Sequence, residues 1–228
     1  MTIQSNFPKN GNEALKRLME GNERFVNGIR AVEPMFSHLK MPELSENGQK
    51  PFVIVLTCSD SRSPVEMIFD QGLGDVFVVR VAGNVVAPSL LASMEFAAAN
   101  FGSPLLLVMG HTKCGAVNAT LQHAKNPADV LPSVHLEELV SRIRPAVEKM
   151  ATKFGYLNDS HMLELCSVEN VKRSMSLILD QSSIIRNMAE QGKIQVEGAI
   201  LDIQTGMVNL LAAQEKLLSV KTKELSQA

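Results

Sequence analysis

Two stretches of the sequence are built alike: residues 52–62 read Phe-Val-Ile-Val-Leu-Thr-Cys-Ser-Asp-Ser-Arg, and residues 105–115 read Leu-Leu-Leu-Val-Met-Gly-His-Thr-Lys-Cys-Gly. Each begins with a short, continuous apolar run and ends in polar residues that include a cysteine. Such runs are typical of strands buried on both faces, as in a parallel sheet covered by helices. Similar runs at 76–79 and 194–203 predict two more strands. Because these strands alternate with helical segments, the sequence predicts a doubly wound α/β fold.

The segments around these strands show helical periodicity. Residues 12–27 place apolar side chains at helical spacing and end before Gly28, which predicts an amphipathic helix. Residues 30–50 contain prolines and little periodicity, so we expect a loop there. Further helices are predicted at 90–101, 133–151 and 167–191. We find no repeat or linker and expect a single domain over residues 1–228.

Composition excludes several classes of function. The 22 Lys and Arg residues nearly balance 24 Asp and Glu, giving a formal charge of -2, and aromatic residues make up 4% of the chain with no Trp. This argues against a nucleic-acid partner or an anionic membrane surface. No apolar run reaches the ~20 residues that a membrane span needs. The first residues lack the pattern of a signal peptide and the three cysteines are far apart, so we expect a cytoplasmic protein without a disulfide framework.

The polar residues after the two central strands carry metal-binding chemistry. Cys58, Asp60 and Arg62 alternate along an extended segment and can share one side of it. His111 and Cys114 are spaced i and i+3 in a turn that opens a helix. Two cysteines, a histidine and an aspartate form the ligand set of a tetrahedral zinc site. Both groups follow the carboxyl ends of predicted parallel strands, where open α/β sheets bind ligands. The alternative for either group alone is buried cysteines, a turn histidine and a surface ion pair.

Together these motifs resemble the β-class carbonic anhydrase signature, which combines Cys-Ser-Asp-Ser-Arg with His-x-x-Cys-Gly. The similarity includes 48–52, 69–84 and 94–96, and it resumes at 198–206. It covers most of residues 12–122 and 168–210. The resemblance implies a central, mainly parallel sheet of four strands in the order 2-1-3-4, with room for an extra edge strand.

The resemblance also implies a zinc enzyme that interconverts carbon dioxide and bicarbonate, with one Zn²⁺ per subunit. Cys58, His111 and Cys114 would be the fixed ligands. Asp60 would be a conditional fourth ligand, which pairs with Arg62 when water takes its place. This chain has Val55 where a subset of the family has Trp beside an inhibitory bicarbonate pocket. It therefore resembles the subset with an open zinc.

Three protein ligands and a water are the mark of a catalytic zinc site. Zinc lowers the pKa of bound water towards neutrality and supplies hydroxide to attack carbon dioxide. We expect Asp60 to orient that hydroxide and Arg62 to hold Asp60 away from the metal, so that both residues are catalytic.

Four further positions match the family's substrate pocket. Gln49 corresponds to a glutamine that donates to bicarbonate across a dimer interface, and Phe77 and Phe96 correspond to an apolar wall. The backbone N–H of Gly115 would face the substrate. For the two phenylalanines, plain core packing is an equal alternative. We expect a homodimer, or a tetramer formed by two dimers, in which the helix at 12–27 is an arm that wraps the partner.

Two rival functions fit the same residues. One is a hydrolase of the same fold that acts on carbon disulfide or carbonyl sulfide. The other is a closed, non-catalytic zinc module with Asp60 as a permanent ligand, although such a site needs neither Arg62 nor Gln49. We expect Cys166 to be a buried thiol outside the site. Nothing in the sequence selects a proton shuttle among the remaining histidines.

Overall fold

A computed structural model describes residues 7–32, 36–155 and 158–225. Its centre is one sheet in the order β2-β1-β3-β4-β5. The strands are β1 (Val53–Thr57), β2 (Val76–Arg80), β3 (Leu105–His111), β4 (Gln195–Leu201) and β5 (Val208–Leu210). Pairing is parallel among the first four, and β5 is antiparallel to β4. The predicted order 2-1-3-4 is confirmed, and β5 is the additional edge strand.

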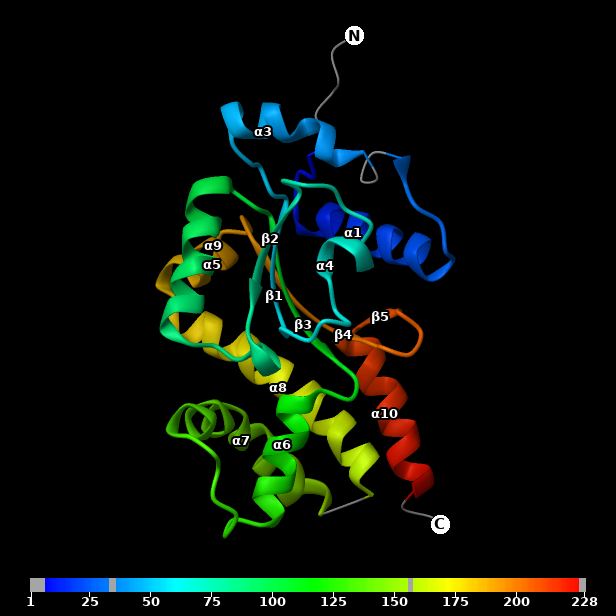
Figure 1. The fold of residues 1–228 in the computed structure, drawn as a ribbon, viewed down its shortest axis with the longest axis vertical. Helices are drawn as coiled ribbons and strands as arrows, with labels where there is room; N and C mark the ends of the chain where they lie inside the picture. Colours follow the sequence, from blue (N-terminus) through cyan, green and yellow to red (C-terminus); the bar gives the residue numbers. More distant parts are fainter. Residues whose placement is uncertain (1–6, 33–35, 156–157, 226–228) are drawn as a thin grey trace.

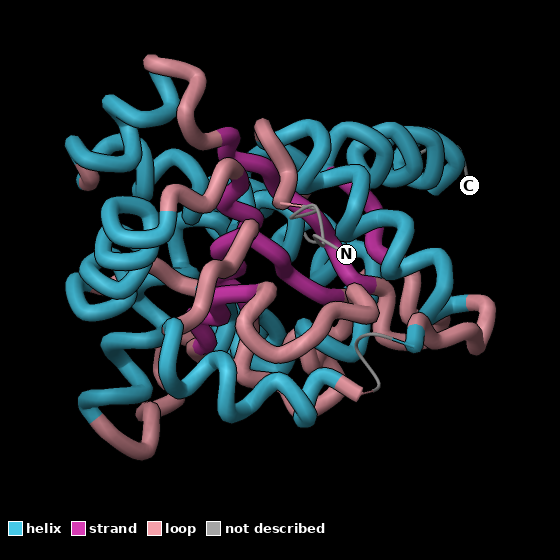
Figure 2. The backbone as a smooth tube through the Cα atoms, turned by 90° about the horizontal axis from the view of Figure 1, so that it is seen from above, coloured by secondary structure: helices cyan, strands magenta, loops and turns pink. Residues whose placement is uncertain are grey.

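The central strands are buried on both faces, as their continuous apolar runs predict. Every residue of β1 and β3 is buried. Because strand side chains alternate, Ile54 and Leu56 face one apolar core, whereas Val53 and Val55 face a second core on the other side of the sheet. A sheet with both faces covered needs helical layers above and below it, and Figure 2 shows helices surrounding the strands.

The larger helical layer covers the face of Ile54. Its helices are α5 (Pro88–Phe101), α6 (Gly115–Lys125), α7 (Val134–Phe154), α8 (Asp159–Gln181), α9 (Ser183–Glu190) and α10 (Leu211–Leu225). All of them contribute to the apolar cluster on this face. The predicted helix at 167–191 is in fact two helices: α8 begins earlier, and Ser182 ends it and caps α9 by accepting a hydrogen bond from the Ile185 N–H.

The smaller layer consists of α1 (Gly11–Val26) and α4 (Val65–Ile68) (Figure 1). Ala14 and Leu18 of α1 are fully buried against the same subunit's sheet. Gly21 allows the close approach, because a Cβ there would lie 1.8 Å from the Phe69 carbonyl oxygen. The apolar stripe of this helix is therefore buried within its own subunit, and contact of its outer face with a partner stays a prediction. The apolar side chains of α1 pack on the second face of this sheet, which would otherwise be exposed.

Polar contacts hold α1 in this position. The Asn22 side chain donates to the Ile68 and Gly206 carbonyls and accepts from the Val208 N–H at 2.8 Å, which ties the helix to β5. Arg24 donates to the buried carboxylate of Asp70 at 2.6 Å.

In its described residues, the segment expected to be a loop at 30–50 contains the short helices η1 (Ser37–Lys40) and α3 (Met41–Asn47). Pro42 lies in the first turn of α3, where a missing N–H costs little, so this proline marks a helix start rather than excludes one. A further short helical turn, η2 (Ala82–Asn84), follows β2. No helix in the described part of the chain is both long and apolar enough to cross a membrane.

We predict that Arg24→Ala lowers the free energy of unfolding by about 2 kcal/mol, because it leaves the Asp70 carboxylate buried with weaker compensation from Arg30. Lys16→Ala is the matched control. It removes one positive charge from the same helix, but from an exposed pair with Glu20, and should change the free energy by about 0.5 kcal/mol or less. Urea denaturation measures both. Equal effects of the two substitutions would contradict this account.

Candidate metal centre

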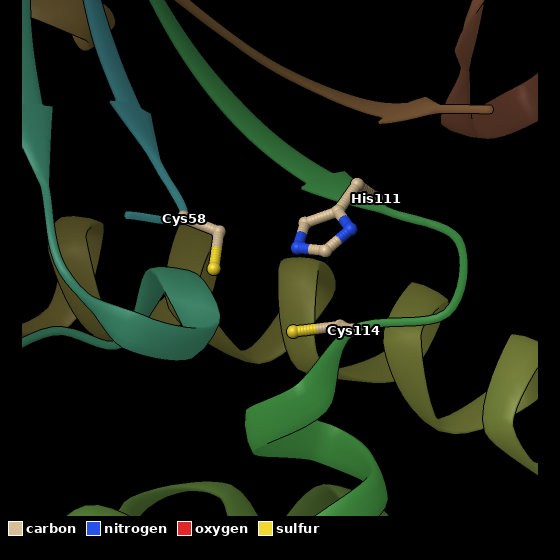
Figure 3. A group of neighbouring side chains, drawn as sticks. All are labelled: Cys58, His111 and Cys114. Carbon is tan, nitrogen blue, oxygen red and sulfur yellow. The ribbon is translucent and has the colours of Figure 1, made fainter. Parts of the chain in front are cut away.

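Cys58, His111 and Cys114 meet at the carboxyl ends of β1 and β3. Their candidate ligand atoms all lie within 4.8 Å of one another, and all three residues are buried. Figure 3 shows both sulfur atoms and one ring nitrogen of His111 turned toward a common space. In the described part of the chain this is the only group of three or more residues with such geometry. The structure therefore brings together the three residues that the sequence selected as metal ligands.

The histidine ring is held in a state that fits a metal ligand. Its Nδ1 atom lies 2.9 Å from the Thr112 carbonyl oxygen and donates to it as the neutral ring's N–H. Among the described residues, the buried Nε2 atom has no hydrogen-bond partner. A backbone acceptor on one nitrogen and a free lone pair on the other is the usual arrangement of zinc-bound histidine. The orphaned nitrogen and the two thiols thus fit a metal ion.

The turn that carries His111 and Cys114 is fixed by contacts to β4. Lys113 has a φ of 55°, a left-handed conformation that turns the chain back so that Cys114 can open α6. The Thr112 N–H donates to the Leu201 carbonyl at 2.9 Å, and its Oγ1 accepts from the Ile203 N–H at 3.1 Å. Sequence reasoning missed Thr112. Its position between the two ligand candidates was the available signal.

Cys58 is positioned by η2. The Gly83 N–H donates to the Cys58 sulfur at 3.3 Å. Gly83 has a φ of 69°, and a Cβ there would lie 2.7 Å from the Ile143 side chain, so glycine is needed for conformation and space. Asn170 of α8 donates to the Gly83 carbonyl at 2.7 Å, and Ser174 donates to the Asn84 carbonyl at 2.9 Å. These supporting residues lie far away in sequence, and no local pattern identified them.

The electrostatics of the two thiols favour a thiolate. Hydrogen bonding from Cys114, assisted by His111 and the Gly83 N–H against the cost of burial, lowers the pKa of Cys58 to about 4. The same contact raises the pKa of Cys114, since a neighbouring thiolate and burial both disfavour a second negative charge. For His111, burial lowers the pKa, but the neighbouring Cys58 sulfur and the Thr112 carbonyl outweigh it and raise the pKa overall. A divalent cation would allow both sulfurs to ionise.

Asp60 lies beside this cluster and is held by Arg62. The guanidinium donates from Nε to Oδ1 at 2.9 Å and from Nη2 to Oδ2 at 2.7 Å, and the Arg62 N–H also donates to Oδ1. These bonds hold the pKa of Asp60 well below its usual range. Oδ2 lies 3.9 Å from the Nε2 atom of His111. The carboxylate of Asp60 therefore borders the metal-binding space while it forms an ion pair with Arg62.

Arg80 supports the same segment. It donates to the Cys58 carbonyl at 3.2 Å and to the Asp60 carbonyl at 2.7 Å, so it fixes the backbone on both sides of Ser59. Sequence reasoning did not single out Arg80, although it directly follows the hydrophobic run of the second strand.

The residues expected around the substrate are separated in the subunit. Gly115 lies at the start of α6, next to Cys114, and is exposed. Phe77 pairs with Ile54, near the amino end of the sheet, about 13 Å along the strand from Cys58. Phe96 is 54% exposed and its ring centroid lies 6.4 Å from that of Phe77. Gln49 is exposed on the loop before β1. The fold does not bring these last three residues to the metal centre of their own subunit.

Cys166 lies elsewhere. It is fully buried in the apolar cluster under α8, and burial raises the pKa of its thiol to about 12. These surroundings are those of a core side chain.

Comparisons with known proteins agree with this geometry. The carbonic anhydrase family model matches residues 53–208. The chain is 36% identical to carbonic anhydrase 2 of Mycobacterium tuberculosis over 85% of this chain and 89% of the relative. It is 34% identical to a carbonic anhydrase of Mycolicibacterium smegmatis over 86% of this chain and 91% of the relative.

Solved structures agree as well. The crystal structure of the β-carbonic anhydrase CafA of Aspergillus fumigatus has a TM-score of 0.67 at 26% identity and covers 94% of this chain and 97% of its own. The β-carbonic anhydrase CcaA has a TM-score of 0.69 at 25% identity, over 86% of this chain and 94% of its own.

We predict that Cys58→Ala, His111→Ala and Cys114→Ala each reduce bound zinc from about one ion per chain to roughly a tenth or less, since three protein ligands hold the ion and each substitution removes one. Plasma emission spectrometry of the purified variants measures the metal. Cys166→Ala is the control: it removes a buried cysteine outside the cluster and should leave zinc content unchanged. Stoichiometric zinc in all three cluster variants would refute the assignment.

Proposed function

The chain belongs to the β-carbonic anhydrase family, and on that premise we propose that Cys58, His111 and Cys114 bind one zinc ion per subunit for the reversible hydration of carbon dioxide. The observation that carries this proposal is the orphaned Nε2 of His111, which faces two thiols beside an aspartate held by an arginine fork. Zinc bound there would lower the pKa of a coordinated water and so supply a nucleophile near neutral pH.

Asp60 is proposed to orient that nucleophile. A carboxylate accepts hydrogen bonds and donates none while ionised, so Asp60 fixes the direction of an O–H beside the metal space. Arg62 keeps Asp60 ionised, because its fork lowers the pKa of the carboxyl group. The same fork occupies both carboxylate oxygens and keeps them from the fourth metal position. This supports an open catalytic site over a closed zinc module, in which the carboxylate would be turned to the metal.

Gly115 is proposed to supply a backbone donor to the substrate. It follows Cys114 directly, and a Cβ built at Gly115 would meet nothing within 4 Å, so there is open space beside the metal centre. The first N–H groups of a helix have no acceptor within that helix and attract anions. A bicarbonate oxygen next to the metal could therefore accept a hydrogen bond from the start of α6.

We further propose that the site is completed by a second copy of the chain. Gln49, Phe77 and Phe96 lie near the amino end of the sheet, whereas the metal centre lies at the carboxyl end. Phe96 is too exposed to be part of the hydrophobic core of its own subunit. Its ring and that of Phe77 form an aromatic surface. Carbon dioxide is apolar, and bicarbonate accepts hydrogen bonds. An apolar wall and an amide from a partner subunit would suit the two molecules, in a homodimer or in a tetramer of two dimers.

We predict that Arg62→Ala keeps zinc and the fold but lowers carbon dioxide hydration by about a hundredfold, because the freed Asp60 carboxylate can turn to the metal position. The loss should persist at alkaline pH. Asp60 is ionised there in the wild type and in the variant, so raising the pH restores no missing charge. Stopped-flow hydration rates and zinc content measure the two effects. Arg186→Ala, which removes a guanidinium bonded to carbonyls at the end of α8, is the control. Near wild-type turnover of the Arg62 variant at alkaline pH would contradict the mechanism.

We predict that Gln49→Ala keeps zinc but weakens bicarbonate dehydration several-fold, from loss of one substrate hydrogen bond. Mixing this variant with zinc-deficient His111→Ala subunits should restore activity. In a mixed dimer one site combines an intact metal centre with an intact Gln49 from the other subunit. A mixture no more active than the sum of its parts, after subunit exchange is verified by mass, would mean that Gln49 does not act across an interface.

A further inference from the structure

Among the residues that the structure describes, no carboxylate pairs with the guanidinium of Arg173 in α8. In the part of the chain that the structure describes, its buried Nε atom has no hydrogen-bond partner. The nearby carboxylates are used by other cations: Glu169 pairs with Lys149, and Glu215 pairs with Lys172. A buried N–H of a charged group costs free energy when no acceptor is bound to it. Such an unpaired donor therefore points to a ligand that supplies the acceptor.

A cavity of about 110 Å³ adjoins this side chain. Its polar lining comes from Arg142, Arg173, Asn170, Ser174 and Gln181, and no carboxylate lines it. Asn170 and Ser174 donate away from it, to the carbonyls of Gly83 and Asn84. The cavity thus has two guanidinium groups on its walls. Arg142 is partly neutralised by Glu138 and donates to the Val86 carbonyl, which leaves Arg173 as the uncompensated charge.

We propose that this cavity binds a small oxyanion, with Arg173 as its principal donor. A guanidinium presents a planar fork of N–H groups that matches the oxygens of bicarbonate, phosphate or sulfate. The volume admits such an anion and excludes a nucleotide. The larger groove that Arg173 also lines differs in charge, because Glu169, Asp180, Glu197 and Glu215 line it together with Lys149 and Lys172.

The cavity adjoins the segment that supports Cys58. Val85 and Val86 form part of its wall. The same segment begins at Gly83, whose N–H donates to the Cys58 sulfur. An anion in the cavity would therefore be separated from that sulfur by the backbone that Asn170, Ser174 and Arg142 support. It would lie apart from the proposed substrate position beside Gly115 and would be a second, non-catalytic anion site.

The test is calorimetric titration of the zinc enzyme with inorganic phosphate at constant ionic strength. We expect saturable binding by the wild type and at least tenfold weaker binding by Arg173→Ala. Lys172→Ala is the matched control, because it removes the same charge from the adjacent position of α8 but from outside the cavity. It should bind as the wild type does. Arg173→Gln, which keeps most of the side-chain length, carries the test if the alanine variant does not fold.

A selenate soak of wild-type crystals locates the site by anomalous scattering, and we expect a peak between Arg142 and Arg173. Equal phosphate affinity in the wild type and both Arg173 variants would overturn the proposal. So would a peak without calorimetric binding, which would be an adventitious ion only. A change of oligomeric mass in Arg173→Ala with unchanged phosphate affinity would assign Arg173 to an interface between copies and also overturn it.

Discussion

The register of β1 on β3 is the constraint on which the rest of the metal centre depends. Thr57, the last residue of β1, pairs with Met109, and β3 continues along β4 for two more residues. Cys58 directly follows β1 and His111 is the last residue of β3, so both lie at the same edge of the sheet. A shift of one residue would turn every side chain to the opposite face and would exchange the two apolar cores. The apolar residues of β1 and β3, which fill both cores, therefore also specify the spacing of the ligand atoms.

Competition for one carboxylate sets the chemistry that this edge can support. Asp60 stands between a guanidinium that it already binds and a metal space that it borders. Neither contact is unusual by itself, since aspartate suits arginine and zinc equally well. Under the proposed function, their placement on either side of one short side chain would make the occupancy of the fourth metal position depend on a local rearrangement. Arg80 fixes the backbone, so that this rearrangement is confined to side chains.

Sequence reasoning succeeded where one short segment contains the whole signal. The two central buried strands and the cluster of Cys58, His111 and Cys114 follow from two eleven-residue stretches and the geometry of parallel sheets, whereas the order 2-1-3-4 came from the family resemblance. It could not say where an apolar helix stripe packs. Residues 12–27 are equally amphipathic whether the stripe covers their own sheet or a neighbour, and the close approach of Gly21 to Phe69 places it on their own sheet. Asn170 and Ser174 lie outside any motif, because their role depends on the path of a distant loop.

The rotation of α8 about its own axis limits which insertions and deletions this protein can tolerate. Cys166, Asn170 and Ser174 lie on one side of the helix, at four-residue intervals that keep them aligned, and each contacts a different part of the molecule. Inserting or deleting one residue upstream of them within the helix would turn that side by about 100° and break every such contact at once. Length variation among descendants of this sequence should therefore collect in the connections between helices, such as 126–133, and spare the interior of α8. The spacing of these contact residues along α8 can therefore be kept only as a whole.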